Sequence, residues 1–253
     1  IISDSQIIAT TPAGTGTVDV SVMTGVGNTT RTSAYTYLAG TLLNVSMSAT
    51  PSTVTRGSNV TYSSTMSVTG GTATNASWTI DLPTGLSVDT MNWPLSWLCS
   101  VGVVQVICTK SSAAPGNYAF SLIAQVDAGA APGPTTATIT AMADNATTAS
   151  NSATVSVALP AASISLVSAP SPSITGQTVT MTATVTGASG SPTGSVTFQD
   201  GATTLGTVTL AGGVATFQTN ALSTGSHSLT AVYGGDSNYA GSTSSAGGCP
   251  DRC

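Results

Sequence analysis

The sequence contains no glutamate and very little charge of any kind. Its 253 residues include only nine acidic residues, all aspartate, and four basic ones, whereas about a quarter of a typical soluble protein is charged. Four scattered basic residues cannot neutralise a nucleic-acid backbone or form a polybasic lipid-binding segment, so both partners are excluded. Solubility must come from Ser, Thr, Asn and Gln, whose hydration depends little on pH or salt. Such a surface suits the outside of a cell.

Long apolar runs and helix-forming residues are also scarce. The longest apolar run, Val101 to Cys108, has the length of a strand, far below the ~20 residues of a membrane-spanning helix. There is one lysine and no glutamate, and Gly and Pro recur throughout. These features predict an all-β protein with no membrane insertion. The chain opens on Ile1 without an initiator Met or a signal peptide, so we interpret it as a processed or excerpted piece of a longer protein.

The residues that catalysis or metal binding would need are nearly missing. The one histidine, His227, lies within a predicted strand, where we expect it on a solvated face and outside any Ser–His–Asp arrangement. Asp81, Asp200 and Asp236 occupy turns or strand ends, where Asp is favoured for its side-chain hydrogen bonds. Neither a Cys-x-x-Cys nor an Asp-x-Asp cluster occurs. The sequence therefore predicts no enzyme activity, no cofactor and no metal.

The four cysteines fall into two pairs. Cys99 and Cys108 lie on opposite arms of a hairpin-sized loop, and in an exported protein we expect them to form a disulfide. Closing so short a loop would stabilise the fold by about 2–3 kcal/mol. Cys249 and Cys253 form a Cys-x3-Cys sequence. A disulfide within that pair, a link to another chain and two free thiols all remain open, and we favour a disulfide.

All three tryptophans lie in the stretch 75–110. Trp78 alternates with apolar residues in a strand pattern, so we predict that it is buried. Trp93 and Trp97 are the candidates for aromatic side chains that face a ligand, such as a stacking platform for a sugar. The alternative, which we favour, is that they pack over the disulfide.

Residues 1–40 contain one clear alternating strand. Val18, Val20 and Val22 alternate with polar residues, as in a half-buried antiparallel strand. Together with the sequences Ser-Gln-Ile at 5–7, Ala-Thr-Thr-Pro-Ala-Gly at 9–14 and Tyr-Thr-Tyr at 35–37, this strand resembles the C-terminal half of an IPT/TIG domain, an immunoglobulin-like module. The family's first strands are missing here. So short a segment buries too little apolar surface to stand alone, so this half-module needs a partner segment.

Residues 41–160 form a fuller module, in which 60–68 and 118–126 alternate between apolar and polar residues. Its ordered motifs are Gly57 with Val60-Thr61-Tyr62, Asp81 to Leu86, Trp97 with Cys99, Val106 to Thr109, and Pro115-Gly116. They resemble the repeat domain of bacterial surface proteins known as domain of unknown function eleven. Within them Pro83-Thr84-Gly85 is a turn, because Pro fixes φ and Gly accepts a positive φ.

Residues 161–253 follow a linker at 159–162. Their motifs are Pro192 to Gly201, Leu205-Gly206, Gly225 to Tyr233, and Gly235 to Tyr239. These closely resemble a bacterial Ig-like repeat that is common in giant surface proteins and adhesins. The match breaks after Ser242, where the family has one more hydrophobic strand. The sequence from Ser244 to Cys253 lacks that pattern, so we expect the module to lack its usual last strand.

The sequence thus predicts tandem immunoglobulin-like β-sandwiches, arranged as an elongated rod on a bacterial cell surface. The first functional hypothesis is structural, because both end modules read as incomplete. An open sheet edge can accept a strand from another chain, and head-to-tail repetition of that contact builds a fibre. We expect a homo-oligomer, a pilus-like filament or stalk, joined through residues 1–40 and 161–253.

The second hypothesis is a binding module. It would be an adhesin fragment, or an Ig-like decoration of a virus particle, that recognises surface glycans. Its candidate ligand-facing residues are Trp93 and Trp97.

Overall fold

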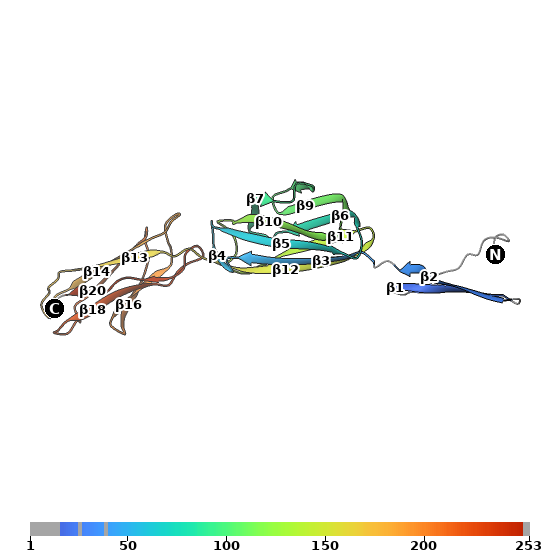
Figure 1. The fold of residues 1–253 in the computed structure, drawn as a ribbon. Coiled ribbons are helices and arrows are strands. Elements are labelled where there is room, and N and C mark those ends of the chain that lie inside the picture. The colour runs from blue at the N-terminus through green and yellow to red at the C-terminus, as the bar shows by residue number, and fades with distance from the viewer. Residues whose placement is uncertain (1–15, 25–26, 38–39, 250–253) are drawn as a thin grey trace. The chain divides into compact units, whose positions relative to one another are not determined.

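The protein is all-β, as its composition predicts. The computed structural model describes residues 16–24, 27–37 and 40–249, and every regular element among them is a β-strand (Figure 1). Two compact units are present. The first contains residues 1–52, 59–125 and 135–155, and the second contains residues 53–58, 126–134 and 156–253. The described residues include no helix long and apolar enough to cross a membrane.

The N-terminal strands form a sheet of their own. Strand β1 (Gly16–Thr24) pairs antiparallel with β2 (Gly27–Tyr37), with a register shift between Val18 and Val20. A hydrogen bond of 2.7 Å between the Ser21 and Thr30 hydroxyls links the two strands. Within the described part of the chain, neither strand pairs with any other.

Residues 42–158 form two sheets. The four-stranded sheet has the order β3 (Leu42–Thr50), β5 (Asn59–Thr69), β10 (Gly116–Val126) and β7 (Leu86–Asn92). The six-stranded sheet has the order β4 (Thr53–Thr55), β12 (Ala146–Ala158), β11 (Gly133–Ala143), β6 (Ala73–Asp81), β9 (Gln105–Ala113) and β8 (Leu98–Val101). Strand β4 pairs with β12 in parallel.

Alternating side chains bring these two sheets face to face. On β5 every second residue from Val60 to Val68 is buried, which is the period of a strand with one covered face. Trp78 of β6 stacks on Phe120 of β10 with ring centroids 4.4 Å apart, so an aromatic pair joins the two sheets. Trp78 is 1% exposed, which confirms that it is a core residue.

The rest of the second unit is a second pair of sheets. One has the order β13 (Ser163–Ala169), β14 (Val179–Thr186) and β17 (Val214–Thr219). The other has the order β16 (Thr203–Thr209), β15 (Ser195–Asp200), β18 (His227–Tyr233) and β19 (Ser242–Thr243), and β20 (Gly247–Cys249) also pairs with β18. Met181, Phe198 and Tyr233 lie in their shared core. Tyr239 closes it, and a side chain at Gly187 would overlap the Tyr239 ring.

One expectation about this unit is wrong. The sequence after Ser244 has no alternating apolar pattern, yet Gly247, Gly248 and Cys249 form a strand that pairs antiparallel with Leu229, Ser228 and His227. Ladder hydrogen bonds use only backbone groups, so two glycines can complete a sheet edge without apolar side chains.

Candidate functional site

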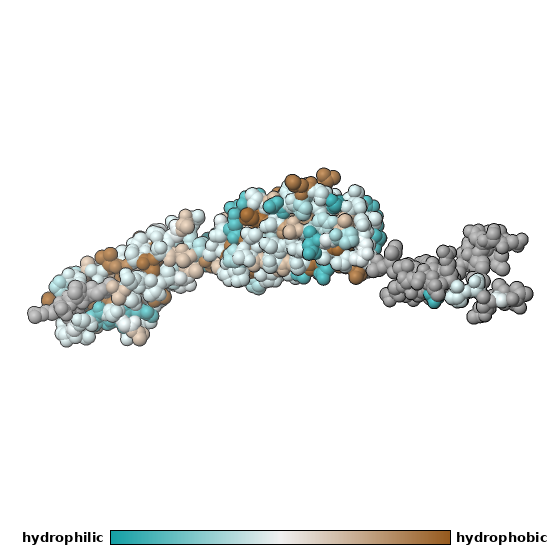
Figure 2. Space-filling model, in the orientation of Figure 1, coloured by the Kyte–Doolittle hydropathy of each residue, from teal (hydrophilic) through white to brown (hydrophobic). Residues whose placement is uncertain are grey.

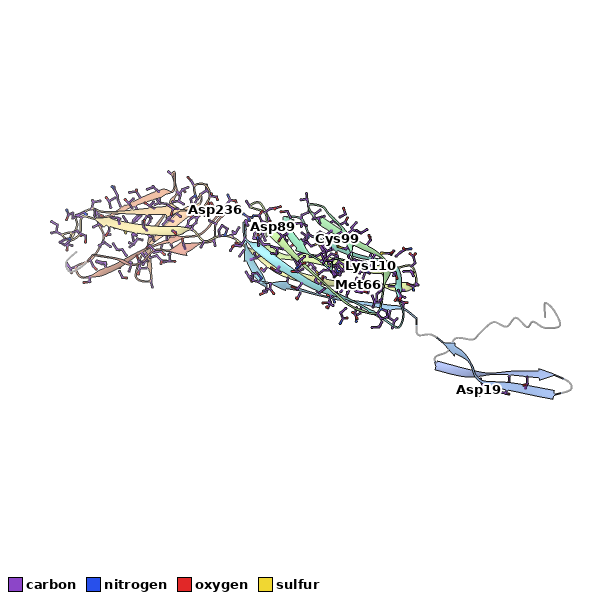
Figure 3. The ribbon with its side chains drawn as sticks, turned by 45° about the horizontal axis from the view of Figure 1, so that its top comes forward. Asp19, Met66, Asp89, Cys99, Lys110 and Asp236 are labelled. Atoms are coloured by element: carbon purple, nitrogen blue, oxygen red, sulfur yellow. A yellow bond between two sulfur atoms is a disulfide. The ribbon has the colours of Figure 1, made fainter. Side chains whose placement is uncertain are left out.

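Cys99 and Cys108 form a disulfide between two neighbouring strands (Figure 3). The two residues are opposite each other in the β8–β9 pair. Strand β8 is the outermost strand of its sheet, so the bond holds an edge strand to its neighbour. Of the second cysteine pair, Cys253 and the side chain of Cys249 lie outside the described residues.

Trp97 cannot face a ligand. Its side chain is 2% exposed and packs edge-on against Tyr118 and Phe120, with ring centroids 5.3 Å apart in each pair. Of the two alternatives for Trp97, the ligand-facing one is therefore wrong and burial, which we favoured, is observed, because the loop after β7 turns this side chain into the core. The Trp97 N–H donates to the Pro94 carbonyl at 2.9 Å, which closes the turn.

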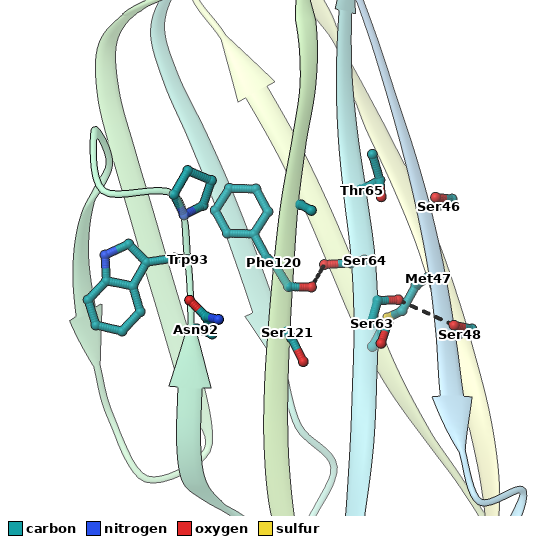
Figure 4. Close-up of a pocket in the computed structure, with 12 residues that line it drawn as sticks. Ser46, Met47, Ser48, Ser63, Ser64, Thr65, Asn92, Trp93, Phe120 and Ser121 are labelled. Atoms are coloured by element: carbon teal, nitrogen blue, oxygen red, sulfur yellow. Dashed lines mark hydrogen bonds between the residues drawn. The ribbon is translucent and has the colours of Figure 1, made fainter.

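Trp93 stands at the other end of this turn and lines a shallow groove of about 600 Å³ (Figure 4). It is partly exposed, and together with Asn92 and Pro94 it forms the wall of the groove. Strands β3, β5 and β10 supply the floor, to which Met47 and Phe120 also contribute. Its small side chains lie in two rows across the sheet, Ser46–Thr65–Ala119 and Ser48–Ser63–Ser121. Residues that alternate along a strand share a face, and these six face away from the core.

The groove is uncharged and exposes both apolar and polar surface. None of its lining residues carries a charge. Ser48 Oγ contacts the Ser63 carbonyl at 3.5 Å, at the limit of a hydrogen bond. Buried Ser64 instead donates to the Phe120 carbonyl at 3.4 Å. The surface thus offers hydroxyl groups, the Asn92 amide and apolar groups that include one indole ring, without a charged side chain that could select a charged ligand.

Exposed apolar side chains gather around the disulfide hairpin. The loop before β8 and the β8–β9 hairpin carry Leu95, Leu98, Val101, Val103, Val104 and Ile107, all at least 38% exposed. Figure 2 shows brown, hydrophobic atoms projecting where Figure 1 labels β7 and β9. Leu95 is the most exposed of them, at 103%.

His227 does not lie on a solvated face, so that expectation is wrong. Its side chain is 8% exposed, and Nδ1 lies 2.5 Å from Asp200 Oδ2 while Nε2 lies 2.9 Å from the Ser223 carbonyl. Two acceptors favour the doubly protonated ring. The hydrogen bond to the Ser223 carbonyl, then the one to Asp200, raises the pKa of His227, although burial opposes the shift. Sequence reasoning missed this pair because it placed Asp200 and His227 in separate turn and strand patterns.

Asp236 organises the loop after β18. Its carboxylate accepts hydrogen bonds from the Thr193 N–H and hydroxyl, both at 2.8 Å, and from the N–H groups of Asn238 and Tyr239 at 2.7 and 2.8 Å. Burial alone would raise the pKa of this carboxyl, but the hydrogen bonds outweigh it and hold the pKa well below its usual range. All of these donors belong to the protein, so Asp236 has a structural role.

The other aspartates in the described part of the chain likewise give no sign of a metal site. Among the described residues, no group of three or more His, Cys, Asp or Glu side chains could hold an ion.

Part of the chain matches a known family. Residues 166–247 match the family model of the bacterial Ig-like domain (group 3). This agrees with the resemblance of residues 161–253 to a bacterial Ig-like repeat. The IPT/TIG and domain-of-unknown-function-eleven resemblances are not confirmed and stay predictions. No curated protein matches the chain.

Solved structures are similar only at low identity. The fibronectin(III)-like modules of Clostridium thermocellum CbhA are 16% identical over 79% of this chain and 91% of that chain, with a TM-score of 0.29. The C-terminal domain of the Streptococcus agalactiae AgI/II polypeptide BspA is 8% identical over 80% and 97%, at 0.35. The type II cohesin dyad of the Acetivibrio cellulolyticus scaffoldin ScaA is 8% identical over 62% and 60%, at 0.33. These scores carry no argument about function.

Proposed function

We propose that the chain is a non-catalytic building block of a bacterial surface structure, a pilus-like filament or stalk, whose copies are joined by β-strand sharing. The bacterial Ig-like match over residues 166–247 supports this class of protein. The nearly uncharged composition and the disulfide suit an extracellular, oxidising environment. The proposal includes three modules, an IPT/TIG-like one at 1–40, a surface-repeat one at 41–160 and the Ig-like repeat at 161–253.

The β1–β2 hairpin is the observation that carries the proposal. These two strands pair only with each other among the described residues, and an isolated two-stranded sheet is at best marginally stable in water. No further described strand covers either outer edge of the hairpin, so a strand from another chain can pair there. Asp19 and Ser21 of β1 are exposed, and they alternate in sequence with valines, the pattern of a strand with one covered face. A neighbouring chain can supply the missing sheet.

Strand β13 is a suitable acceptor for this hairpin. It is an outer strand and pairs with β14 on one side only, within the described residues. Natural edge strands are usually protected by charge, proline or a bulge, but β13 reads SISLVSA and carries neither charge nor proline. Val167 on this strand is 66% exposed. Contact between residues 1–40 of one copy and 161–253 of the next would repeat without closing, which gives a fibre.

The hydrogen bonds of His227 support the absence of a catalytic role in this proposal. Both of its ring nitrogens are occupied by Asp200 and the Ser223 carbonyl. Neither nitrogen can therefore activate a serine hydroxyl as a general base.

The molar mass of the purified chain as a function of concentration tests the proposal. Light scattering coupled to size exclusion should show species that grow steadily with concentration. Removal of residues 1–40 should leave a monomer. Val167→Lys should weaken assembly, because a lysine on an edge strand opposes pairing.

The matched control is Ile174→Lys. Ile174 is also apolar and 75% exposed, but it lies outside every strand, so this variant should assemble like the natural sequence. A monomer at every concentration, or unchanged assembly without residues 1–40, would refute strand sharing.

A second candidate function is recognition of surface glycans by an adhesin-like or virion-decorating module. The one observation that favours it is the uncharged groove beside Trp93.

A further inference from the structure

We propose that the groove beside Trp93 is a binding site for a neutral polysaccharide, with the indole ring of Trp93 stacking on a sugar. The inference deepens the second candidate function and does not depend on strand sharing. Its evidence is the lining of the groove, the way Trp93 is held, and the absence of charge among the lining residues.

The two sides of the groove match the two kinds of surface on a pyranose. A sugar ring presents C–H groups on its faces, which pack on the apolar face of an indole, and hydroxyl groups around its rim. Trp93 supplies the indole at the wall. The floor supplies hydroxyl groups, each able to donate and accept a hydrogen bond, from Ser46, Ser63, Thr65 and Ser121. In Figure 4, Asn92 and Phe120 are drawn between Trp93 and the strands that carry these hydroxyls.

The backbone around Trp93 is held in place before any ligand binds. Trp93 follows directly on β7, which ends at Asn92. On its other side, the hydrogen bond from Trp97 N–H to the Pro94 carbonyl closes the turn, and buried Trp97 anchors that turn against Phe120. A backbone held on both sides of Trp93 limits the positions that its indole can take, which lowers the entropy cost of binding.

The absence of charge selects the class of ligand. Anionic polysaccharides, phosphates and cations would leave water without gaining an opposite charge, which costs free energy. A neutral polysaccharide exchanges hydrogen bonds with water for hydrogen bonds with Ser, Thr and Asn groups. The groove volume of about 600 Å³ lies within the range of small-molecule sites, so it can take a short stretch of a polysaccharide chain.

The test is affinity electrophoresis of the full chain in gels that contain dextran, mannan, xylan or galactan, with anionic alginate as a further gel. At least one neutral polysaccharide should retard the protein, and alginate should not. Trp93→Ala should lower the affinity measured from the retardation about tenfold or more, as for an aromatic residue that stacks on the ligand. Trp93→Phe should retain part of the binding, because it keeps an aromatic face.

Two further variants separate the groove from its surroundings. Ala119→Leu adds bulk to the exposed floor and should also weaken retardation. Leu95→Ala removes the most exposed apolar side chain of the same loop, which does not line the groove, and should bind like the natural sequence. Unchanged thermal unfolding of each variant shows that the fold is intact.

Several outcomes would overturn the inference. They are no retardation by any of the four neutral polysaccharides, retardation by alginate alone, and undiminished retardation of Trp93→Ala. If instead an extended apolar peptide bound and no polysaccharide did, the groove would be a peptide site and the inference would be wrong. Strand sharing is tested separately by molar mass, so either idea can fail alone.

Discussion

Trp93 and Trp97 lie in one short loop, yet their surroundings give them different roles. Trp97 is buried against Tyr118 and Phe120, whereas Trp93 is partly exposed at the wall of the groove. The turn closed by the Pro94 carbonyl separates the two environments. The sequence could not distinguish them, because both flank the same proline and neither lies in an alternating strand.

Substitution of each tryptophan by alanine should separate these roles. Trp97→Ala leaves a large cavity beside Phe120 and should lower the free energy of unfolding of the first unit by about 3–5 kcal/mol. Trp93→Ala should cost about 1 kcal/mol or less, because the side chain is partly exposed. Chemical denaturation followed by circular dichroism measures both changes. Equal costs would contradict the assignment of Trp97 to the core.

His227 makes the stability of the second unit depend on pH. Its pKa is raised in the folded protein, so the stabilisation is fully present below its unfolded pKa of about 6.5 and is lost as pH rises through the folded pKa. Calorimetry should therefore show a lower Tm for the second unit at about pH 9 than at about pH 6. His227→Gln should remove most of this difference. A Tm that falls equally in both proteins would show that other groups carry the effect.

Among the elements, the β8–β9 hairpin depends on its disulfide. Strand β8 has four residues and lies at the edge of its sheet, so few other interactions hold it. The bond joins residues that are nine apart in sequence, and closing so short a loop removes entropy mainly from the unfolded chain.

The variant Cys99→Ala/Cys108→Ala should lower the free energy of unfolding by about 2–3 kcal/mol. Alanine is preferred to serine because Cys108 is fully buried, where a hydroxyl would need a partner. Urea denaturation measures the change, and reduction of the natural protein should reproduce it. A loss well below 1 kcal/mol in both would contradict the clamping role.

The sequence predicted the strands in which one face is buried. It did not predict β20, the Asp200–His227 pair or the groove. In β5 and β10, apolar residues alternate with polar ones in the sequence. In the structure, every second residue from Val60 to Val68 and from Phe120 to Val126 is buried. Strand β20 could not be found, because its glycines carry no side-chain pattern. The Asp200–His227 pair joins residues 27 apart, and the groove floor requires the register of three strands. Neither is visible in local sequence.

On the scale of the whole molecule, the described residues form stable sandwich sheets and one hairpin that pairs with no further described strand. The sheets of residues 42–158 and 163–249 each enclose a buried core. The β1–β2 pair has no third strand within the described residues. Strand sharing between copies would satisfy its edges, and the rod-like arrangement of modules stays a prediction.

Hydrogen–deuterium exchange of the full chain, measured at low and high protein concentration, tests strand sharing most directly. If β1–β2 of one copy pairs with β13 of the next, backbone amides in 16–37 and 163–169 should exchange more slowly at high concentration, because they become hydrogen-bonded. Amides of β5, in the core of the first unit, should not change. Identical exchange of 16–37 and 163–169 at both concentrations would contradict the account.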